Sequence, residues 1–158
     1  MNKPVPQSTF QIEKLFPQPK ERVFAALQDP TKKRRWFAEG DGFELQSYEL
    51  DFRVGGFERT FFRPKGGPPM TQEAYYFDII PNERIVFAYS MTIAGAPLSA
   101  SLGTMELSST ELDSGKLGTR LLYTEHTAYL DGNDGSVSRR EGTEQLFVAL
   151  ARELELHT

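Results

Sequence analysis

Two glutamates in segments of alternating polarity are the residues of this sequence best suited to acid–base chemistry. Glu125 follows Leu121 and Tyr123 at even spacing, so the three side chains should share one face of a strand. The same spacing places Glu58 beside Thr60. If both glutamates face an apolar cavity, desolvation and mutual repulsion would raise the pKa of at least one of them. Such a group could act as a proton donor, a base or a hydrogen-bond partner for a ligand hydroxyl.

A second interpretation of these carboxylates stays open at this stage. Each could lie at a solvent-exposed rim, or pair with one of the arginines at positions 59, 63 and 120. The register after Gly55-Gly56 is also open, because phenylalanines occur on both faces of that segment and a bulge would exchange Glu58 for Arg59 on the inner face.

Most other catalytic chemistries lack the residues that they need. Cysteine is absent, which excludes disulfides, thiolate metal sites and cysteine nucleophiles. The two histidines, His126 and His157, lie in no metal-binding or catalytic-triad motif, and Gly66-Gly67 lacks the Lys-Ser of a phosphate loop. We expect no metal and no cofactor, and we expect His126 on the outer sheet face, exposed or locally hydrogen-bonded.

Lys32, Lys33, Arg34 and Arg35 form the one basic cluster of the sequence. Four consecutive residues on a helix point in all directions, so we interpret the cluster as a solvated face. The chain as a whole has 18 basic and 22 acidic residues, a net charge of −4. Nucleic acid is therefore not an expected partner.

Length and composition favour one domain over residues 1–158, with a flexible segment at 1–8. The chain has 158 residues, close to the size of one domain, and 39% of them are hydrophobic. Residues 1–9 have no apolar run of the kind found in a signal peptide, and no segment is apolar over the length of a membrane span. We therefore expect a cytoplasmic protein.

Periodicity and turn residues predict an α+β fold. A strand comes first, two short helices follow, and a long amphipathic helix with Leu146, Leu150 and Leu154 ends the chain. Between them lie six strands with short connections, which should form one antiparallel sheet with the first strand. A curved seven-stranded sheet wrapped around one helix leaves an internal cavity. The expected strands are 9–16, 43–52, 57–63, 71–80, 84–93, 98–111 and 118–129, and the helices are 19–27, 29–37 and 138–156.

Several motifs, in this order, resemble landmarks of the SRPBCC superfamily, which includes START-like and birch-pollen-allergen-like proteins. They resemble most closely the branch named for activators of the heat-shock-protein-90 ATPase. The motifs are Val23-Phe24-Ala25-Ala26-Leu27 with Asp29-Pro30 and Trp36, then Arg53-Val54-Gly55-Gly56, then 81–87, then Gly118-Thr119-Arg120-Leu121, and finally Arg140-Glu141-Gly142.

The resemblance implies a helix-grip fold with an internal cavity, but it implies no single reaction. It favours the Leu121 face of the last strand as the inner one, so that Glu125 would point into the cavity near its mouth. Many relatives have tryptophan after the glycine that is Gly142 here, whereas this chain has Thr143. We expect that wall of the pocket either to be missing or to be supplied by Phe147.

We predict that the protein binds a small hydrophobic or aromatic ligand, such as a lipid-, sterol- or polyketide-like molecule. The alternatives are a cyclase, aromatase or hydrolase that uses Glu125 and Glu58, and a co-chaperone-like module that stimulates a heat-shock ATPase. Binding is favoured over catalysis, and a homodimer is left open. The residues expected to bind the ligand are Trp36, Phe37, Glu58, Thr60, Tyr76, Phe87, Tyr89, Met91, Met105, Tyr123, Glu125 and Phe147.

Overall fold

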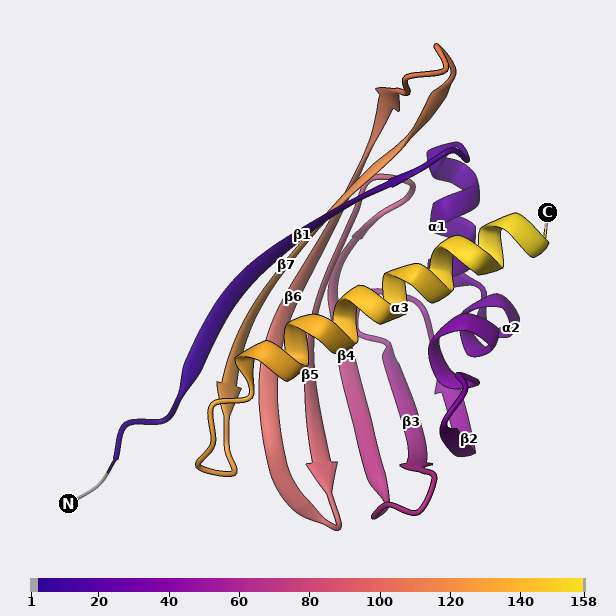
Figure 1. Ribbon diagram of the computed structural model, residues 1–158. Helices are drawn as coiled ribbons and strands as arrows, with labels where there is room; N and C mark the ends of the chain where they lie inside the picture. The colour runs from indigo at the N-terminus through magenta and orange to yellow at the C-terminus, as the bar shows by residue number, and fades with distance from the viewer. Residues whose placement is uncertain (1–2, 158) are drawn as a thin grey trace.

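A seven-stranded antiparallel sheet bends around the long C-terminal helix in the computed structural model, which describes residues 3–157 (Figure 1). The strand order is β1-β7-β6-β5-β4-β3-β2, so consecutive strands pair from β2 to β7, and β1 closes the edge beside β7. The elements are β1 (Gln7–Phe16), α1 (Lys20–Gln28), α2 (Pro30–Lys33), a π-helical turn η1 (Arg34–Ala38), β2 (Phe43–Leu50), β3 (Phe57–Pro64), β4 (Met70–Ile80), β5 (Arg84–Ile93), β6 (Ala96–Glu111), β7 (Leu117–Tyr129) and α3 (Ser136–Leu156).

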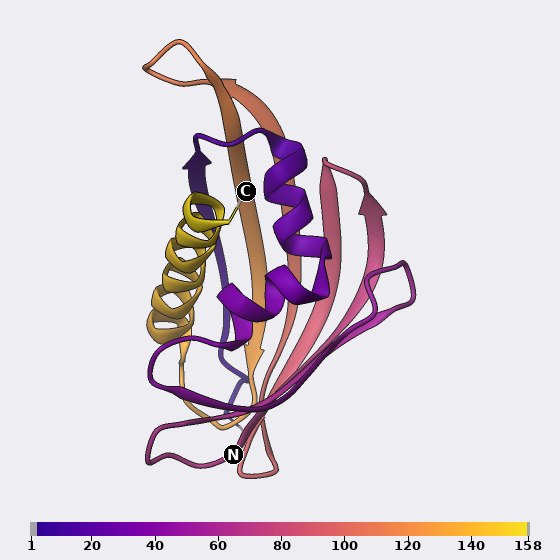
Figure 2. The same ribbon diagram turned by 90° about the vertical axis from the view of Figure 1, so that its right-hand side faces the viewer.

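The order of elements confirms the predicted α+β helix-grip fold. Helix α3 crosses the concave face of the sheet, and α1, α2 and η1 lie beside it over the same face (Figure 2). None of the helices within residues 3–157 has the length and apolar character that crossing a membrane requires.

The N-terminal strand is longer than predicted. Gln7 and Ser8, which we expected in a flexible segment, belong to β1 and pair with Ala128 and Thr127 of β7. The carbonyl of Pro6 also accepts a hydrogen bond from the backbone of Tyr129, with N and O 2.9 Å apart. Of the expected flexible segment, Met1 and Asn2 lie outside the described residues.

The second short helix changes its geometry partway along. Asp29 caps it as its sequence position predicts, since its Oδ1 accepts hydrogen bonds from the backbone of Thr31 at 2.8 Å and Lys32 at 3.2 Å. The α-helix then gives way to the π-helical η1, which ends where Glu39 N donates to Arg34 O. Such turns place one more residue in a helical turn and are frequent at functional sites.

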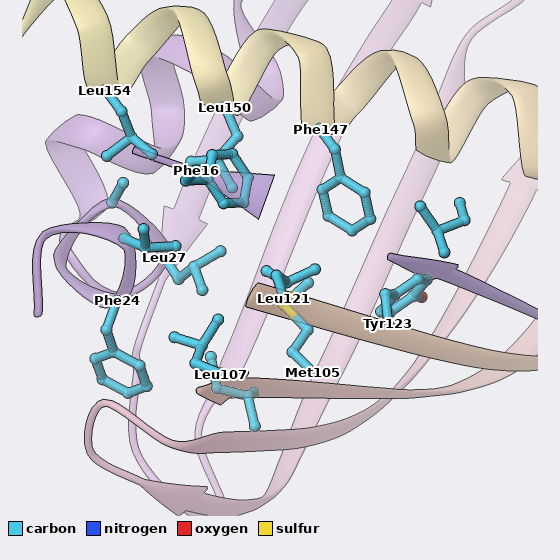
Figure 3. Packing of buried hydrophobic residues seen from close by; sticks show 14 of the residues in the cluster. Phe16, Phe24, Leu27, Met105, Leu107, Leu121, Tyr123, Phe147, Leu150 and Leu154 are labelled. Carbon is cyan, nitrogen blue, oxygen red and sulfur yellow. The ribbon is translucent and has the colours of Figure 1, made fainter. Parts of the chain in front are cut away.

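The core forms where α3 meets the sheet. Phe147, Leu150 and Leu154 are buried against Phe16 and Leu121 (Figure 3). Leu146 is only half-buried, so Phe147 rather than Leu146 continues the leucine stripe toward the helix N-terminus. Each buried leucine or phenylalanine contributes about 1.5–3 kcal/mol by removing its side chain from water, which fixes α3 on the sheet.

Candidate functional site

Glu58 and Glu125 both point to the concave side of the sheet, as predicted. Glu58 is 2% exposed and Glu125 is 0% exposed. Strand pairing places Glu58 opposite the buried Ala74, while Arg59 points outward over the ring of Phe57. The register question at Gly55-Gly56 is thereby answered in favour of Glu58. Neither glutamate lies at a solvent-exposed rim, so that part of the second interpretation is wrong; each pairs with a cation, although not with Arg59, Arg63 or Arg120.

The partner of Glu58 is a lysine and not one of the expected arginines. Lys33 Nζ lies 2.6 Å from Glu58 Oε2, and both side chains are almost fully buried. Tyr48 Oη donates to the same oxygen at 2.7 Å. The other carboxylate oxygen receives only a longer hydrogen bond of 3.3 Å from Gln72, whose own carbonyl accepts from Thr60.

Two tyrosines near Glu58 are kept in their neutral form. Lys33 Nζ lies 3.5 Å from Tyr76 Oη, and Tyr48 contacts the carboxylate directly. Burial, and secondarily the charge of Glu58, raise the pKa of both hydroxyls well above the ordinary range of a tyrosine. Both therefore remain hydrogen-bond donors at neutral pH.

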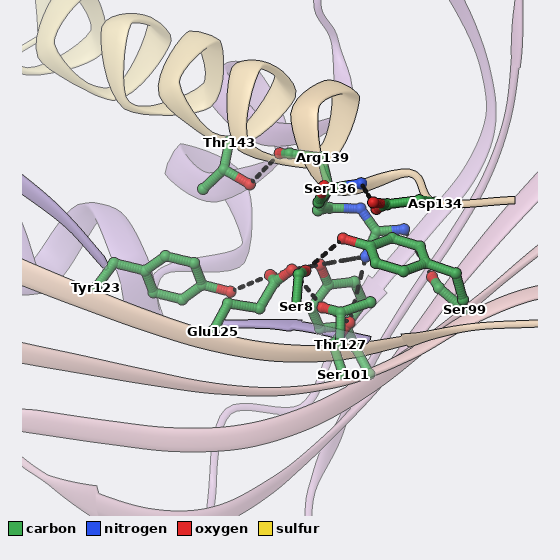
Figure 4. A network of polar contacts seen from close by, with 12 residues as sticks. Ser8, Ser99, Ser101, Tyr123, Glu125, Thr127, Asp134, Ser136, Arg139 and Thr143 are labelled. Carbon is green, nitrogen blue, oxygen red and sulfur yellow. Dashed lines mark hydrogen bonds and ion pairs between the residues drawn. The ribbon is translucent and has the colours of Figure 1, made fainter. Parts of the chain in front are cut away.

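Glu125 lies in a second polar network, near the start of α3 (Figure 4). Tyr89 and Tyr123 each donate a hydroxyl hydrogen bond of 2.6 Å to Oε1, and Thr127 donates one of 2.7 Å to Oε2. Arg139 Nη1 lies 3.6 Å from Oε2. Burial, with the negative charge of Glu125, raises the pKa of Tyr89 and of Tyr123.

Arg139 connects this network to three hydroxyl groups on the sheet. Its guanidinium donates to Ser99 at 2.6 Å, Ser101 at 3.2 Å and Tyr89 at 3.1 Å. These donors and acceptors satisfy the polar groups that α3 and the sheet bury together (Figure 4). The same helix turn holds Thr143, whose hydroxyl donates to the carbonyl of Arg139 instead of forming an aromatic wall.

The two carboxylates differ in their remaining capacity to accept a hydrogen bond. Three hydroxyl groups and a guanidinium surround Glu125, which leaves little capacity to accept another hydrogen bond. On Glu58, by contrast, Oε1 accepts only one long hydrogen bond, while Oε2 faces an ammonium group and the hydroxyl of Tyr48. Glu58 is therefore the better candidate for exchange of a proton or contact with a ligand.

A row of aromatic rings links the two networks. The rings of Tyr76 and Phe87 have centroids 6.3 Å apart, and Phe87 stacks on Tyr89 at 5.9 Å and on Tyr123 at 6.3 Å. Gly103 makes this arrangement possible, because a Cβ at that position would lie 2.6 Å from Phe87 Cζ and 2.9 Å from Tyr123 Oη. Phe87 is nearly parallel to Tyr89 and Tyr123 but is tilted by 49° against Tyr76, and one carboxylate network lies at each end of the row.

A small cavity, partly open to solvent, lies at the Lys33 end of this row. Its volume is about 10 Å³, roughly the space of one water molecule. Of the predicted ligand-binding residues, Tyr76, Phe87 and Met105 line it. Leu27, Lys33, Phe52 and Ile85 complete the lining. A larger groove of about 540 Å³ lies elsewhere, beside the β4–β5 turn and the base of the β6–β7 hairpin, and none of the predicted residues line it.

The remaining residues predicted to bind the ligand do not line this cavity. Trp36 is buried and donates its indole N–H to the carbonyl of Ala26 at 2.8 Å, with Phe37 packed against its edge. Phe147 packs edge-on against Tyr123 from α3. Met91 is half-buried on β5 and is not part of the cavity lining.

Sequence reasoning missed both cations of the site, Lys33 and Arg139. The interpretation of the basic cluster as a solvated face is wrong for Lys33, which is 7% exposed. It is also wrong for Arg35, which lies outside the site and forms two hydrogen bonds with Glu153 of α3. A signal was present: Lys33 precedes Trp36 by three positions, and Arg139 precedes Thr143 by four. Both spacings put the cation on the buried side of a helix.

The outer face of β7 is as expected. His126 is exposed, and its Nδ1 forms a hydrogen bond of 2.9 Å with the hydroxyl of Thr9. Within residues 3–157, histidine, aspartate and glutamate side chains form no group of three that could hold a metal ion.

Comparison with known proteins gives relatives over nearly the whole chain. A sequence model described as Activator of Hsp90 ATPase homolog 1-like protein matches residues 17–155. A solved structure from Rhizobium loti is 46% identical, covers 96% of this chain and 99% of its own, and superposes with a TM-score of 0.85. An uncharacterised protein from Rhizobium leguminosarum is 36% identical over 96% and 97% of the two chains, with a TM-score of 0.87. The comparison with curated proteins gives no match.

Proposed function

The chain belongs to the family of Activator of Hsp90 ATPase homolog 1-like proteins, and we propose that it binds a small molecule with an apolar, planar body on the concave face of the sheet, beneath the helices that cover this face. The ligand would lie along the aromatic row formed by Tyr76, Phe87, Tyr89 and Tyr123. Its polar groups would meet the Glu58 network at one end and the Glu125 network at the other.

One observation carries this proposal: two buried carboxylates flank a row of aromatic rings. Buried ion pairs stabilise a fold little compared with apolar residues of the same size, so two of them in one interior need another explanation. Ligand sites combine apolar walls with a few fixed polar groups, and that is the composition of this interior. Because the cavity is small, the ligand has to displace side chains, of which Met105 is the most adaptable.

A thermal-shift screen tests the proposal. The library contains aromatic and lipid-like compounds, and Trp36, the one tryptophan of the chain, reports binding by its fluorescence. We expect some apolar aromatic compounds to raise the melting temperature and to change the Trp36 emission. A protein that only docks other proteins would ignore every such compound, and that result would contradict the proposal.

A matched pair of variants tests the location. Met105→Ala enlarges the apolar cavity, and enlarged apolar cavities of this kind take up small aromatic molecules. We therefore expect it to tighten the binding of a hit compound, since no side chain has to be displaced. Leu117→Ala, at a residue that is 69% exposed, should leave the affinity unchanged. Equal affinities for the two variants would exclude the cavity as the binding site.

A further inference from the structure

We propose that Lys33 forms a reversible imine with the carbonyl group of an apolar aldehyde or ketone in the small cavity. This inference rests on the proposed function, because the carbonyl compound is the ligand of the same interior. It names the chemical class of the ligand and adds a covalent step to binding.

The position of Lys33 carries the argument. Lys33 lines a small cavity whose other walls are apolar or aromatic, among them Phe52, Phe87 and Met105, and its Nζ lies 3.5 Å from the hydroxyl of Tyr76, another lining residue. A lysine amine attacks a carbonyl group once it has given up a proton, and an adjacent base can accept that proton. The geometry for this transfer is present, since the side chain of Lys33 is 9% exposed and Glu58 Oε2 lies 2.6 Å from its Nζ.

The carboxylate of Glu58 can accept the proton that the ammonium group gives up. Transfer from Lys33 Nζ to Glu58 Oε2 replaces two buried charges with two neutral groups, which an apolar interior tolerates better. The other ionisable groups facing the pair are the hydroxyls of Tyr48 and Tyr76, which stay protonated. They can donate hydrogen bonds but do not compete for the proton.

The reaction balances without a further reactant. The neutral Nζ of Lys33 attacks the carbonyl carbon and forms a carbinolamine, and the Tyr76 hydroxyl near Nζ is in reach to donate a hydrogen bond to its oxygen. Glu58 then returns its proton to that oxygen. The C–O bond breaks, and the oxygen leaves as water with this proton and one from the former ammonium group. The product is a protonated imine that keeps the positive charge of Lys33 beside the Glu58 carboxylate.

Reductive trapping on the whole protein tests the step. The probe is 4-phenylbutan-2-one with sodium cyanoborohydride, which turns an imine into a stable amine that peptide mapping by mass spectrometry locates. Lys32, the neighbouring residue on the same helix, is the internal control, because it has no such partner in the cavity. We expect modification of Lys33 in preference to Lys32 and the other lysines.

Two variants and a second ligand make the outcome decisive. Glu58→Gln keeps the shape of the side chain but cannot accept the proton, so trapping should slow by about 100-fold, as for loss of a positioned acid–base group. Lys33→Met should abolish it. Equal labelling of surface lysines, or an unchanged rate in Glu58→Gln, would overturn the inference.

The alcohol 4-phenylbutan-2-ol separates this inference from the proposed function. It has the same apolar body but no carbonyl group, so it should raise the melting temperature and slow the trapping by competition. If both compounds raise the melting temperature while Lys33 stays unmodified, the imine is refuted and binding stands. If neither compound nor any other apolar ligand raises the melting temperature, the proposed function itself fails.

Discussion

At the scale of single residues, each buried carboxylate is stabilised by one cation and by tyrosine hydroxyls. Glu58 pairs with Lys33 and accepts a hydrogen bond from Tyr48. Glu125 pairs with Arg139 and accepts hydrogen bonds from two tyrosines. Desolvation would otherwise make an ionised carboxylate very costly in this interior. The arrangement therefore fixes the polar ends of the proposed ligand site before any ligand arrives.

Replacement of Glu125 by glutamine tests how much its network stabilises the fold. The variant removes the negative charge beside Arg139 and disturbs three hydroxyl hydrogen bonds, so we expect a loss of about 3 kcal/mol in the free energy of unfolding. Urea denaturation measures it. The control is Glu13→Gln, which breaks the exposed pair with Arg120 and should cost less than about 1 kcal/mol. Equal effects of the two substitutions would contradict this account.

At the scale of elements, the fold was predictable and the site only in part. Alternation placed the strands, and the leucine spacing placed α3, because those patterns follow from burial on one face. The inward direction of Glu58 and Glu125 followed from the same alternation together with the family resemblance. The cationic partners of both glutamates, Lys33 and Arg139, did not, since they come from helices whose contact with the sheet depends on tertiary packing. The π-helical η1 has no recognised pattern in the sequence.

Gly103 shows how a single strand position controls the aromatic row. Substitution by alanine would place a methyl group in steric overlap with Phe87 and Tyr123, so the rings must shift. We expect the free energy of unfolding, measured by urea denaturation, to decrease by about 1–3 kcal/mol. Gly142 of α3 is the matched control, because a Cβ there meets open space. Gly142→Ala should stabilise the protein by about 0.5–1 kcal/mol. A Gly103→Ala variant as stable as the parent would show that the rings do not depend on this position.

At the scale of the whole molecule, ion pairs and caps hold the helices over the sheet. Arg35 of η1 binds Glu153 of α3 with hydrogen bonds of 3.0 and 2.7 Å, and these raise the pKa of Arg35 further. Arg22 of α1 donates to the carbonyls of Leu154 and His157 at the end of α3. The tyrosines of the interior make the stability of this assembly depend on pH.

Stability should fall with rising pH above about pH 10. Tyr48, Tyr76, Tyr89 and Tyr123 have raised pKa values in the folded protein, mainly through burial. In the unfolded chain they ionise near pH 10, so the unfolded state then binds fewer protons than the folded state, and the free energy of unfolding decreases by up to about 1.4 kcal/mol per pH unit for each tyrosine. Below that pH their contribution is fully present.

Urea denaturation at a series of pH values from neutral to alkaline measures this slope. Tyr123→Phe removes one of the four groups and should make the slope shallower while keeping the ring in place. An unfolding free energy that stays constant or rises in the alkaline range would mean that these hydroxyls are not buried as described.

The most direct measurement of the central claim is a methyl NMR spectrum of methionine-labelled protein titrated with 4-phenylbutan-2-ol. Met105 lines the small cavity, whereas Met70 lies at the start of β4 away from it. We expect the Met105 methyl signal to shift with the ligand and to show contacts with its aromatic ring, while Met70 stays unchanged. Saturating ligand that shifts the Met70 signal but leaves the Met105 signal unmoved would contradict binding at this cavity on the concave face of the sheet.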